Sequence, residues 1–314
     1  MSDDMRRLVM AGKKLSRRGF LKGSVVASTG AAALSLEEQV LLAKASEKPA
    51  APAPKDKGLP TGKIGKIKIT RLICGGNLIG GWAHSRKLKY VSSLMNHYFT
   101  DEKIIETWEI CEANGINTAI TVVDKRTNRL LSKHWKNGGK IQWIAQLRSR
   151  LQDPTAEAKL AVDNGAVGAF LIGNEGDSWV KFEKGLEGIR KIVSFTKDKG
   201  LIAGVGGHLA NVPITCEKEG IEPDFYFKTI NDVKYHCETP AKTIEFMKKV
   251  KKPWIAYKVL GAGVVSPTKG FKYALQNGAD FMCVGMFDFQ IKDDAQIVRG
   301  IFARGVKRQR PWRG

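Results

Sequence analysis

The chain has 314 residues, and its 52 lysine and arginine residues outnumber its 31 aspartate and glutamate residues, which gives a formal net charge of +21. This length is enough for one large domain with a substantial core. The basic residues are scattered along helical segments without interleaved aromatic residues, which is not the pattern of a nucleic-acid-binding surface, so nucleic acid is excluded as a partner.

The first segment, residues 1–45, has the features of an export signal. Arg17 and Arg18 lie in "SRRGFLKG", which is followed by the small, apolar run "GSVVASTGAAALSL" and by an A-x-A cleavage pattern at 43–45. This combination is typical of a twin-arginine signal. The apolar run is too short and too rich in Ala, Gly and Ser for a permanent membrane span. We therefore expect residues 1–45 to be removed when the twin-arginine machinery exports the protein to the periplasm; the alternative is a basic N-terminus with a chance arginine pair.

Residues 46–61 are predicted to form a flexible linker, because "SEKPAAPAPKDKGLP" combines Pro, Ala and Lys without apolar periodicity. The leader holds eight basic and four acidic residues, so 44 basic and 27 acidic residues remain beyond it, a net charge of +17. Such a charge favours an anionic polysaccharide or an acidic partner, or simply keeps the protein soluble.

Residues 62–314 are predicted to form a (β/α)8 TIM barrel. Eight short apolar runs read as strands buried on both faces, and they begin at about 71, 117, 142, 168, 201, 224, 254 and 280. Their mean spacing is about 30 residues, the length of one βα unit. Helical segments between them end in Asn-Gly, as in "DEKIIETWEICEANG" and "SPTKGFKYALQNG". "GKIGKIKI" at 62–69 is predicted as a hairpin that closes the bottom of the barrel; a doubly wound open sheet is the alternative fold.

The five cysteines show no C-x-x-C spacing, and five cannot all pair. Cys74 and Cys283 lie in apolar runs and are expected in the core. Cys216 and Cys237 lie in polar segments, where a disulfide or a metal bond is open.

Four stretches share a family pattern: "KIKITRLICGGNLIGG", "EANGINTAIT", "AGVGGHLANVPITCEKEGIEPDFYFKTIND" and "PWIAYKVLGAG". Over roughly residues 63–290 they resemble the entry hairpin and first strand, the second strand, the fifth and sixth units, and the seventh strand of the aldo-keto reductases. The resemblance implies a barrel fold and NADP-dependent carbonyl reduction by a tyrosine, a lysine, an aspartate and a histidine.

The residues that this family uses for hydride transfer are not matched, and no tyrosine follows the aspartate position. Ile120 stands at the aspartate, Gln146 or Leu147 at the lysine, Gly173 or Asn174 at the histidine, Gly206 and Gly207 at the Ser-Asn pair, and Ile230 at the aromatic residue that stacks on nicotinamide. The sequence therefore predicts the scaffold without its usual chemistry, and NADP is disfavoured as a cofactor.

Candidate catalytic residues are sought at the carboxyl ends of the strands, where barrel active sites lie. His208 follows the glycines of "GVGGH" and is suited to moving a proton. Lys258, in "AYKVLGAG", is expected to point inward, where loss of water would lower its pKa and make it a base or a Schiff-base lysine. Three carboxylates complete the list of candidates: Asp124, Glu175 and Asp288. We expect His208 and Lys258 to face one cavity.

A long loop at 78–100 is either a lid or a surface excursion, and it is rich in residues such as Trp82, His84, His97 and Tyr98.

The sequence signals for cofactor sites are less specific than those for the catalytic residues. His208, His236 and Cys237 have side chains that bind zinc or another divalent ion, although their spacing matches no metal motif. Glycines at the last two strand ends, Gly261, Gly263 and Gly285, are candidates for binding a phosphate through backbone N–H groups.

Three functions remain open. The first is an exported enzyme that acts on a small polar substrate, sugar-like or carbonyl-bearing, by acid/base chemistry of the isomerase or lyase type, with or without a divalent metal. The second is a nicotinamide-dependent oxidoreductase with a displaced catalytic set, whose cofactor would explain export in the folded state. The third is a barrel without catalysis that binds a ligand at the cell envelope.

Overall fold

The computed structural model describes residues 58–82, 88, 90–237 and 239–314, so the predicted leader and most of the predicted linker lie outside the described residues. Eight parallel strands close into a barrel in the order β10-β3-β4-β5-β6-β7-β8-β9. The strands are β3 (Leu72–Gly75), β4 (Thr118–Val122), β5 (Gln142–Leu147), β6 (Gly168–Leu171), β7 (Ile202–Gly207), β8 (Phe225–Thr229), β9 (Trp254–Tyr257) and β10 (Phe281–Val284). Each predicted strand is present, and the (β/α)8 fold is confirmed.

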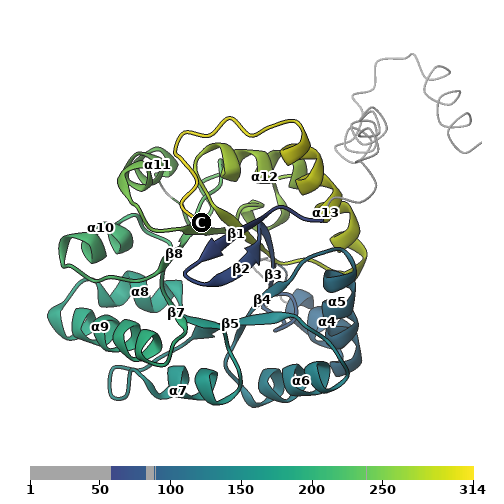
Figure 1. The fold of residues 1–314 in the computed structure, drawn as a ribbon, viewed down its shortest axis with the longest axis horizontal. Helices are drawn as coiled ribbons and strands as arrows, with labels where there is room; N and C mark the ends of the chain where they lie inside the picture. The colour runs from purple at the N-terminus through teal and green to yellow at the C-terminus, as the bar shows by residue number, and fades with distance from the viewer. Residues whose placement is uncertain (1–57, 83–87, 89, 238) are drawn as a thin grey trace, which may run out of the picture. The chain divides into compact units, whose positions relative to one another are not determined.

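Helices alternate with the strands and surround the barrel (Figure 1). They are α4 (Tyr90–Tyr98), α5 (Asp101–Ala113), α6 (Lys125–Lys136), α7 (Ala156–Asp163), α8 (Gly173–Trp179), α9 (Glu183–Asp198), α10 (Asn211–Lys218), α11 (Pro240–Lys249), the 3-10 turn η1 (Gly261–Gly263), α12 (Pro267–Gln276) and α13 (Asp288–Ala303). The predicted Asn-Gly stops are observed, since Asn114 and Asn277 cap α5 and α12. None of the helices described here has the length and apolar character that crossing a bilayer requires.

A two-stranded antiparallel hairpin, β1 (Thr61–Ile64) and β2 (Ile67–Thr70), lies across one end of the barrel (Figure 1). Ile64 and Ile69 are fully buried and belong to the same apolar cluster as the inward side chains of the barrel strands. The predicted closing hairpin is therefore present. It begins at Thr61, and Leu59 is already buried, so the folded domain starts a few residues before Gly62.

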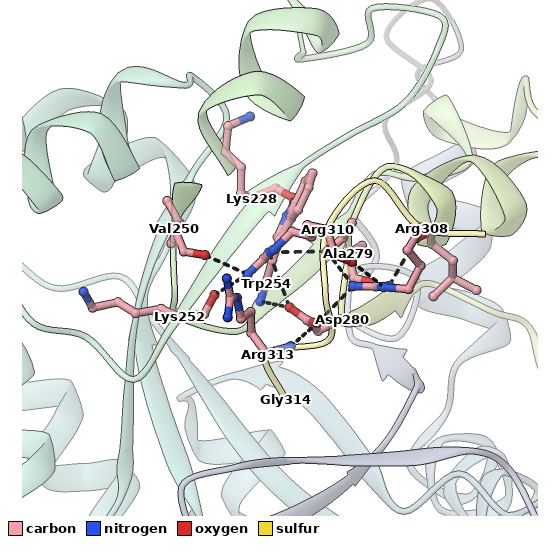
Figure 2. Close-up of polar contacts among 12 residues, drawn as sticks. Lys228, Val250, Lys252, Trp254, Ala279, Asp280, Arg308, Arg310, Arg313 and Gly314 are labelled. Atoms are coloured by element: carbon pink, nitrogen blue, oxygen red, sulfur yellow. Dashed lines mark hydrogen bonds and ion pairs between the residues drawn. The ribbon is translucent and has the colours of Figure 1, made fainter. Parts of the chain in front are cut away.

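The C-terminal segment packs at the same end of the barrel through one buried carboxylate, Asp280 (Figure 2). The Asp280 side chain accepts a hydrogen bond from Arg308 and one from the backbone N–H of Trp254, and its second oxygen lies 3.4 Å from Arg310. Arg71 donates to the backbone oxygen of Asp280 at 2.9 Å. These contacts close the end of the barrel at which the strands begin. The opposite end, formed by the carboxyl ends of the strands, stays open for a site.

Candidate functional site

A cavity of about 870 Å³ lies at the carboxyl ends of the strands, and all eight strands or the loops after them contribute to its lining. The cavity brings together six residues that the sequence singled out: Glu175, His208, His236, Lys258, Gly263 and Gly285. His208 and Lys258 thus face one cavity, as predicted. Four other candidates are not among its lining residues: Asp124, Cys237, Gly261 and Asp288.

His208 is held in place by Asp177 of α8. Its Nδ1 lies 2.7 Å from Asp177 Oδ2, and the same carboxylate accepts hydrogen bonds from the backbone N–H groups of His208 and Leu209, each at 2.9 Å. Because an ionised carboxylate can only accept, Nδ1 carries the proton of the neutral ring, and Nε2 is its basic nitrogen. The arrangement is that of a general base with an orienting carboxylate.

This contact depends on the close approach of α8 to β7. A Cβ atom added to Gly176 would overlap the backbone oxygen of Gly206, and one added to Gly206 would lie 2.5 Å from the backbone oxygen of Leu171. Only glycine leaves the room for this approach. The glycines of "GVGGH" therefore bring the helix that carries Asp177 against the strand that leads to His208.

Tyr257, the last residue of β9, places a phenol next to His208. Their ring centroids are 5.4 Å apart, and the tyrosine ring stacks on Phe227 at 4.1 Å. Tyr257 Oη is buried and has no hydrogen-bond partner among the described residues. Burial raises the pKa of Tyr257 well above its usual value, so the hydroxyl keeps its proton. No described residue accepts the proton of this hydroxyl.

Gly173 provides the space in which these two side chains meet. A Cβ atom at this position would overlap Tyr257 Oη and would lie 3.0 Å from His208 Cε1. The aldo-keto reductase pattern has its histidine at this position or the next one. Here the absence of that side chain makes room for a different pair of polar groups.

A second polar group lies at the ends of β5 and β6. Glu175 is in the first turn of α8, and its Oε2 is buried without a hydrogen-bond partner in the described part of the chain. Burial raises the pKa of Glu175, and nearby Arg148 opposes that shift. The Arg148 guanidinium lies 3.9 Å from the centre of the Trp82 ring, and Gln146 also lines the cavity. This group can hold hydroxyl or carbonyl groups of a ligand.

Lys258 lines the cavity as predicted, but it is less buried than the sequence led us to expect. It follows β9 with a left-handed backbone (φ 55°), is half-buried, and has its Nζ 5.4 Å and 5.9 Å from the ring centres of Tyr235 and Tyr257. Among the described residues, the fully buried lysine is Lys228 of β8, whose side chain points away from the Asp280 cluster in Figure 2. Its Nζ donates to the backbone oxygen of His208 at 2.7 Å, and burial lowers its pKa to about 8.

Asp124 and Asp288 have structural roles instead of the predicted catalytic ones. Asp124 is the N-cap of α6 and accepts a hydrogen bond from the backbone N–H of Thr127 at 2.7 Å. Asp288 begins α13 and accepts a hydrogen bond from Tyr98 Oη at 2.5 Å, with Lys103 Nζ 3.3 Å away. Burial by itself raises the pKa of Asp288, but these two partners hold it below its usual value. Asp124 is thus used by the start of its own helix, whereas Asp288 is used by a tertiary contact with Tyr98 and Lys103.

The predicted metal site is not assembled in the described part of the chain. The rings of His208 and His236 are 5.1 Å apart, but Cys237 is buried with its Sγ 3.6 Å from the backbone oxygen of Thr229. Among the described residues no group of three or more His, Cys, Asp and Glu side chains is placed to bind a metal ion. All five cysteines, including Cys216 and Cys237, are buried and free.

The predicted phosphate site fits an anion poorly. Within the turn after β9, the N–H of Gly261 donates to Lys258 O at 2.9 Å, and the N–H of Gly263 donates to Leu260 O at 2.9 Å. Both N–H groups are therefore used inside the turn. Gly285 lines the cavity but lies opposite the side chain of Leu78.

The positions that hold nicotinamide in the aldo-keto reductase pattern do not fit this cofactor here. A Cβ atom on Gly207 would lie 2.6 Å from Val212 Cβ, and Gly206 is blocked by Leu171, so neither position has room for an amide-binding side chain. Ile230 is buried in the cluster outside the barrel and cannot stack on a ring in the cavity.

Tyr257 was not predicted as a site residue, and Asp177 was noted only as a polar residue of the catalytic face, with a simple turn as the alternative. Tyr257 alternates with inward Ile255 on β9, so the period of two along that strand was a usable signal. Asp177 stands in "GNEGD", which reads as a turn, and only the packing of α8 reveals its contact with His208.

Comparison with known proteins gives similarity in fold alone. No family model and no curated protein sequence matches the chain. Among solved structures, the holo form of the aldo-keto reductase AKR11C1 from Bacillus halodurans is 14% identical, with a TM-score of 0.57 over 80% of this chain and 94% of that one. A truncated 3-deoxy-D-arabino-heptulosonate 7-phosphate synthase from Thermotoga maritima is 10% identical, with a TM-score of 0.50 over 80% of this chain and 95% of that one. The apo form of Gox0644 is 11% identical, with a TM-score of 0.50 over 77% of this chain and 93% of that one.

Proposed function

We propose that this chain is an exported barrel enzyme that moves a proton on a small polar substrate carrying a carbonyl group, in a reaction of the isomerase or lyase type. The observation that carries the proposal is the pair formed by His208, oriented by Asp177, and the unpartnered hydroxyl of Tyr257 at the same cavity. A base and a donor that keeps its proton are the two groups that enolisation of a carbonyl compound requires.

Each group has its own role in this scheme. His208 Nε2 removes the proton from the carbon next to the carbonyl, and Asp177 stabilises the resulting imidazolium. Tyr257 donates a hydrogen bond to the carbonyl oxygen, where negative charge develops. In an isomerisation, the proton then returns from His208 to the former carbonyl carbon, while the proton of the neighbouring hydroxyl group passes to the former carbonyl oxygen. In a lyase reaction, a leaving group on the next carbon departs with its bonding electrons instead. Neither course needs an oxidant or a reductant.

Lys258 and Glu175 lie around this pair. The Lys258 ammonium, 5.9 Å from the centre of the Tyr257 ring, supplies positive charge near the oxygen that becomes negative. Glu175, whose pKa is raised by burial, holds its proton to a higher pH than an ordinary carboxyl group does and can donate to a substrate hydroxyl.

The test is proton exchange in D2O. The purified protein is incubated with dihydroxyacetone, glyceraldehyde, glucose and fructose, and deuterium at the carbon next to the carbonyl is followed by NMR. We expect exchange with the wild type and at least a 100-fold loss in His208→Gln, while Asp177→Asn and Tyr257→Phe reduce it and the exposed control His97→Gln does not. Exchange that persists in His208→Gln would remove the proposed base.

The same preparation separates the two alternatives. Turnover of a simple aldehyde with NADPH would identify an oxidoreductase, which the fold likeness to an aldo-keto reductase favours and the residues at the cofactor positions oppose. Saturable binding of a carbonyl compound without exchange would identify a non-catalytic barrel.

Export is part of the proposal and rests on the paired arginines of the leader. We expect periplasmic protein to begin at residue 46 by mass spectrometry. Replacement of both Arg17 and Arg18 by lysine should leave it in the cytoplasm. Processed protein in the periplasm of that double variant would contradict the twin-arginine assignment.

A further inference from the structure

The lining of the cavity has two unlike halves. The polar half follows strands β5 to β8 and contains Gln146, Arg148, Glu175, His208 and His236. The apolar half follows β9, β10 and β3, which are consecutive neighbours in the closed barrel. Its polar side chains Asn77 and Gln290 carry no charge, and most of its lining is apolar: Leu78, Val91, Met95, Leu260, Val284 and Phe287. Tyr257 and Lys258 lie where the two halves meet.

The apolar half continues out of the cavity onto the surface. Val264, Phe289, Tyr90 and Leu94 are the four most exposed large apolar side chains among the described residues, at 76%, 68%, 60% and 58%, whereas the next, Leu160 on α7, is 48% exposed. Phe289 is in contact with the cavity lining, since its ring stacks on that of Phe287 at a centroid distance of 5.3 Å, and the other three are immediate sequence neighbours of lining residues. We call these four residues the apolar rim.

The apolar rim occupies one sector of the carboxyl face. Tyr90 and Leu94 belong to α4, which follows β3; Val264 follows β9, and Phe289 follows β10. Helix α4 contains no acidic residue, and the carboxylate at the start of α13, Asp288, is already paired with Tyr98 and Lys103. Large apolar side chains gathered in one exposed sector mark a binding surface.

The continuity of the rim with the cavity indicates what binds there. A flat partner, such as a membrane or a second copy of the chain, would cover the rim but would leave the apolar half of the cavity unfilled. A molecule that extends from Tyr257 to Val264 and Phe289 would contact both surfaces. The cavity is apolar on one side and polar on the other, and this division fits a molecule that has one polar end and one apolar end.

We propose that the ligand of this cavity is amphipathic, with a polar head against the His208–Tyr257 half and an apolar chain along the apolar half to the rim. This inference rests on the proposed function in one respect, which is that the polar half of the cavity is taken as the place where the head group binds. It names the substrate class that the proposed chemistry serves.

The test is binding of two homologous series to the full mature chain, measured by titration calorimetry below the critical micelle concentration. One series is hexyl, heptyl and octyl β-D-glucoside, and the other is hexanoate, octanoate and decanoate. We expect the Kd of at least one series to fall by up to about fourfold for each added methylene. Val264→Asp and Phe289→Asp should flatten this dependence, and the matched control Leu160→Asp should leave it intact.

The other outcomes overturn the proposal. A Kd that does not depend on chain length in either series excludes an apolar chain in the cavity. Co-sedimentation with phosphatidylglycerol vesicles that only the rim variants abolish, without a chain-length effect, would assign the rim to a membrane, and self-association that they alone abolish would assign it to a second copy. The binding measurement does not require catalysis. A negative result in the proton-exchange assay would therefore not change the outcome of this test.

Discussion

Replacement of Gly173 by alanine tests whether His208 and Tyr257 meet as described. The added Cβ would overlap Tyr257 Oη and lie 3.0 Å from His208 Cε1, and the tyrosine ring cannot move freely because it stacks on Phe227. Overpacking of this kind costs about 1–3 kcal/mol. For a domain of this size we expect a fall in Tm of about 2–10 °C. Displacement of either reacting group by about 1 Å should reduce proton exchange about 100-fold.

A second substitution shows whether the cost arises at the tyrosine hydroxyl. Tyr257→Phe removes the atom that the new Cβ overlaps, so Gly173→Ala combined with Tyr257→Phe should recover most of the lost stability without recovering activity. Gly58→Ala is the control, since nothing lies within 4 Å of its added Cβ. Circular dichroism melting and the exchange assay measure both effects. The reasoning is refuted if Gly173→Ala melts and turns over like the wild type, or if Tyr257→Phe gives no recovery.

Two further predictions concern buried ionisable groups. The pKa of Lys228 is about 8 in the folded protein and about 10.5 in the unfolded chain. Between these two pH values the unfolded chain binds more protons than the folded protein. The free energy of unfolding of the wild type should therefore rise with pH over this range, by on the order of 3 kcal/mol. The Lys228→Met variant should not show this rise when its free energy of unfolding is measured by urea denaturation at pH 7.5 and 10. If the variant and the wild type show the same pH dependence, the lowered pKa of buried Lys228 is contradicted. The five cysteines should not react with Ellman's reagent in the native protein and should all react in urea, because they are buried and the thiolate is the reactive form. A thiol that reacts quickly in the native state would contradict that burial.

The fold could be predicted because its signals are repeated and local. Eight buried apolar runs at intervals of about 30 residues leave few arrangements other than a closed parallel barrel. The closing hairpin was predictable from alternating isoleucines, of which Ile64 and Ile69 enter the barrel core. The start of the domain was less certain because Leu59, a single buried residue, follows a Pro-rich segment without periodicity of its own.

The site was predicted less well because its contacts are tertiary. His208 was found from its place at a strand end, but its partner Asp177 depends on the close packing of α8, which requires glycines on two elements. The lysines show the same limit. Lys258 was expected to be the buried amine, yet β9 ends one residue earlier and the backbone turns left-handed there, while Lys228 lies within β8 and is fully buried.

The placement of polar groups explains how this barrel can keep a familiar scaffold with different chemistry. In the aldo-keto reductase pattern the ionisable residues are expected near the ends of β4, β5 and β6, where this chain has Ile120, Gln146 and Gly173 at the cavity. The proposed base and donor stand instead near the ends of β7 and β9, and Gly173 leaves the space that they need, because a side chain there would overlap Tyr257 Oη. A side chain at position 173 and the observed place of Tyr257 Oη therefore exclude each other, so the reacting groups of the proposed function come from β7 and β9.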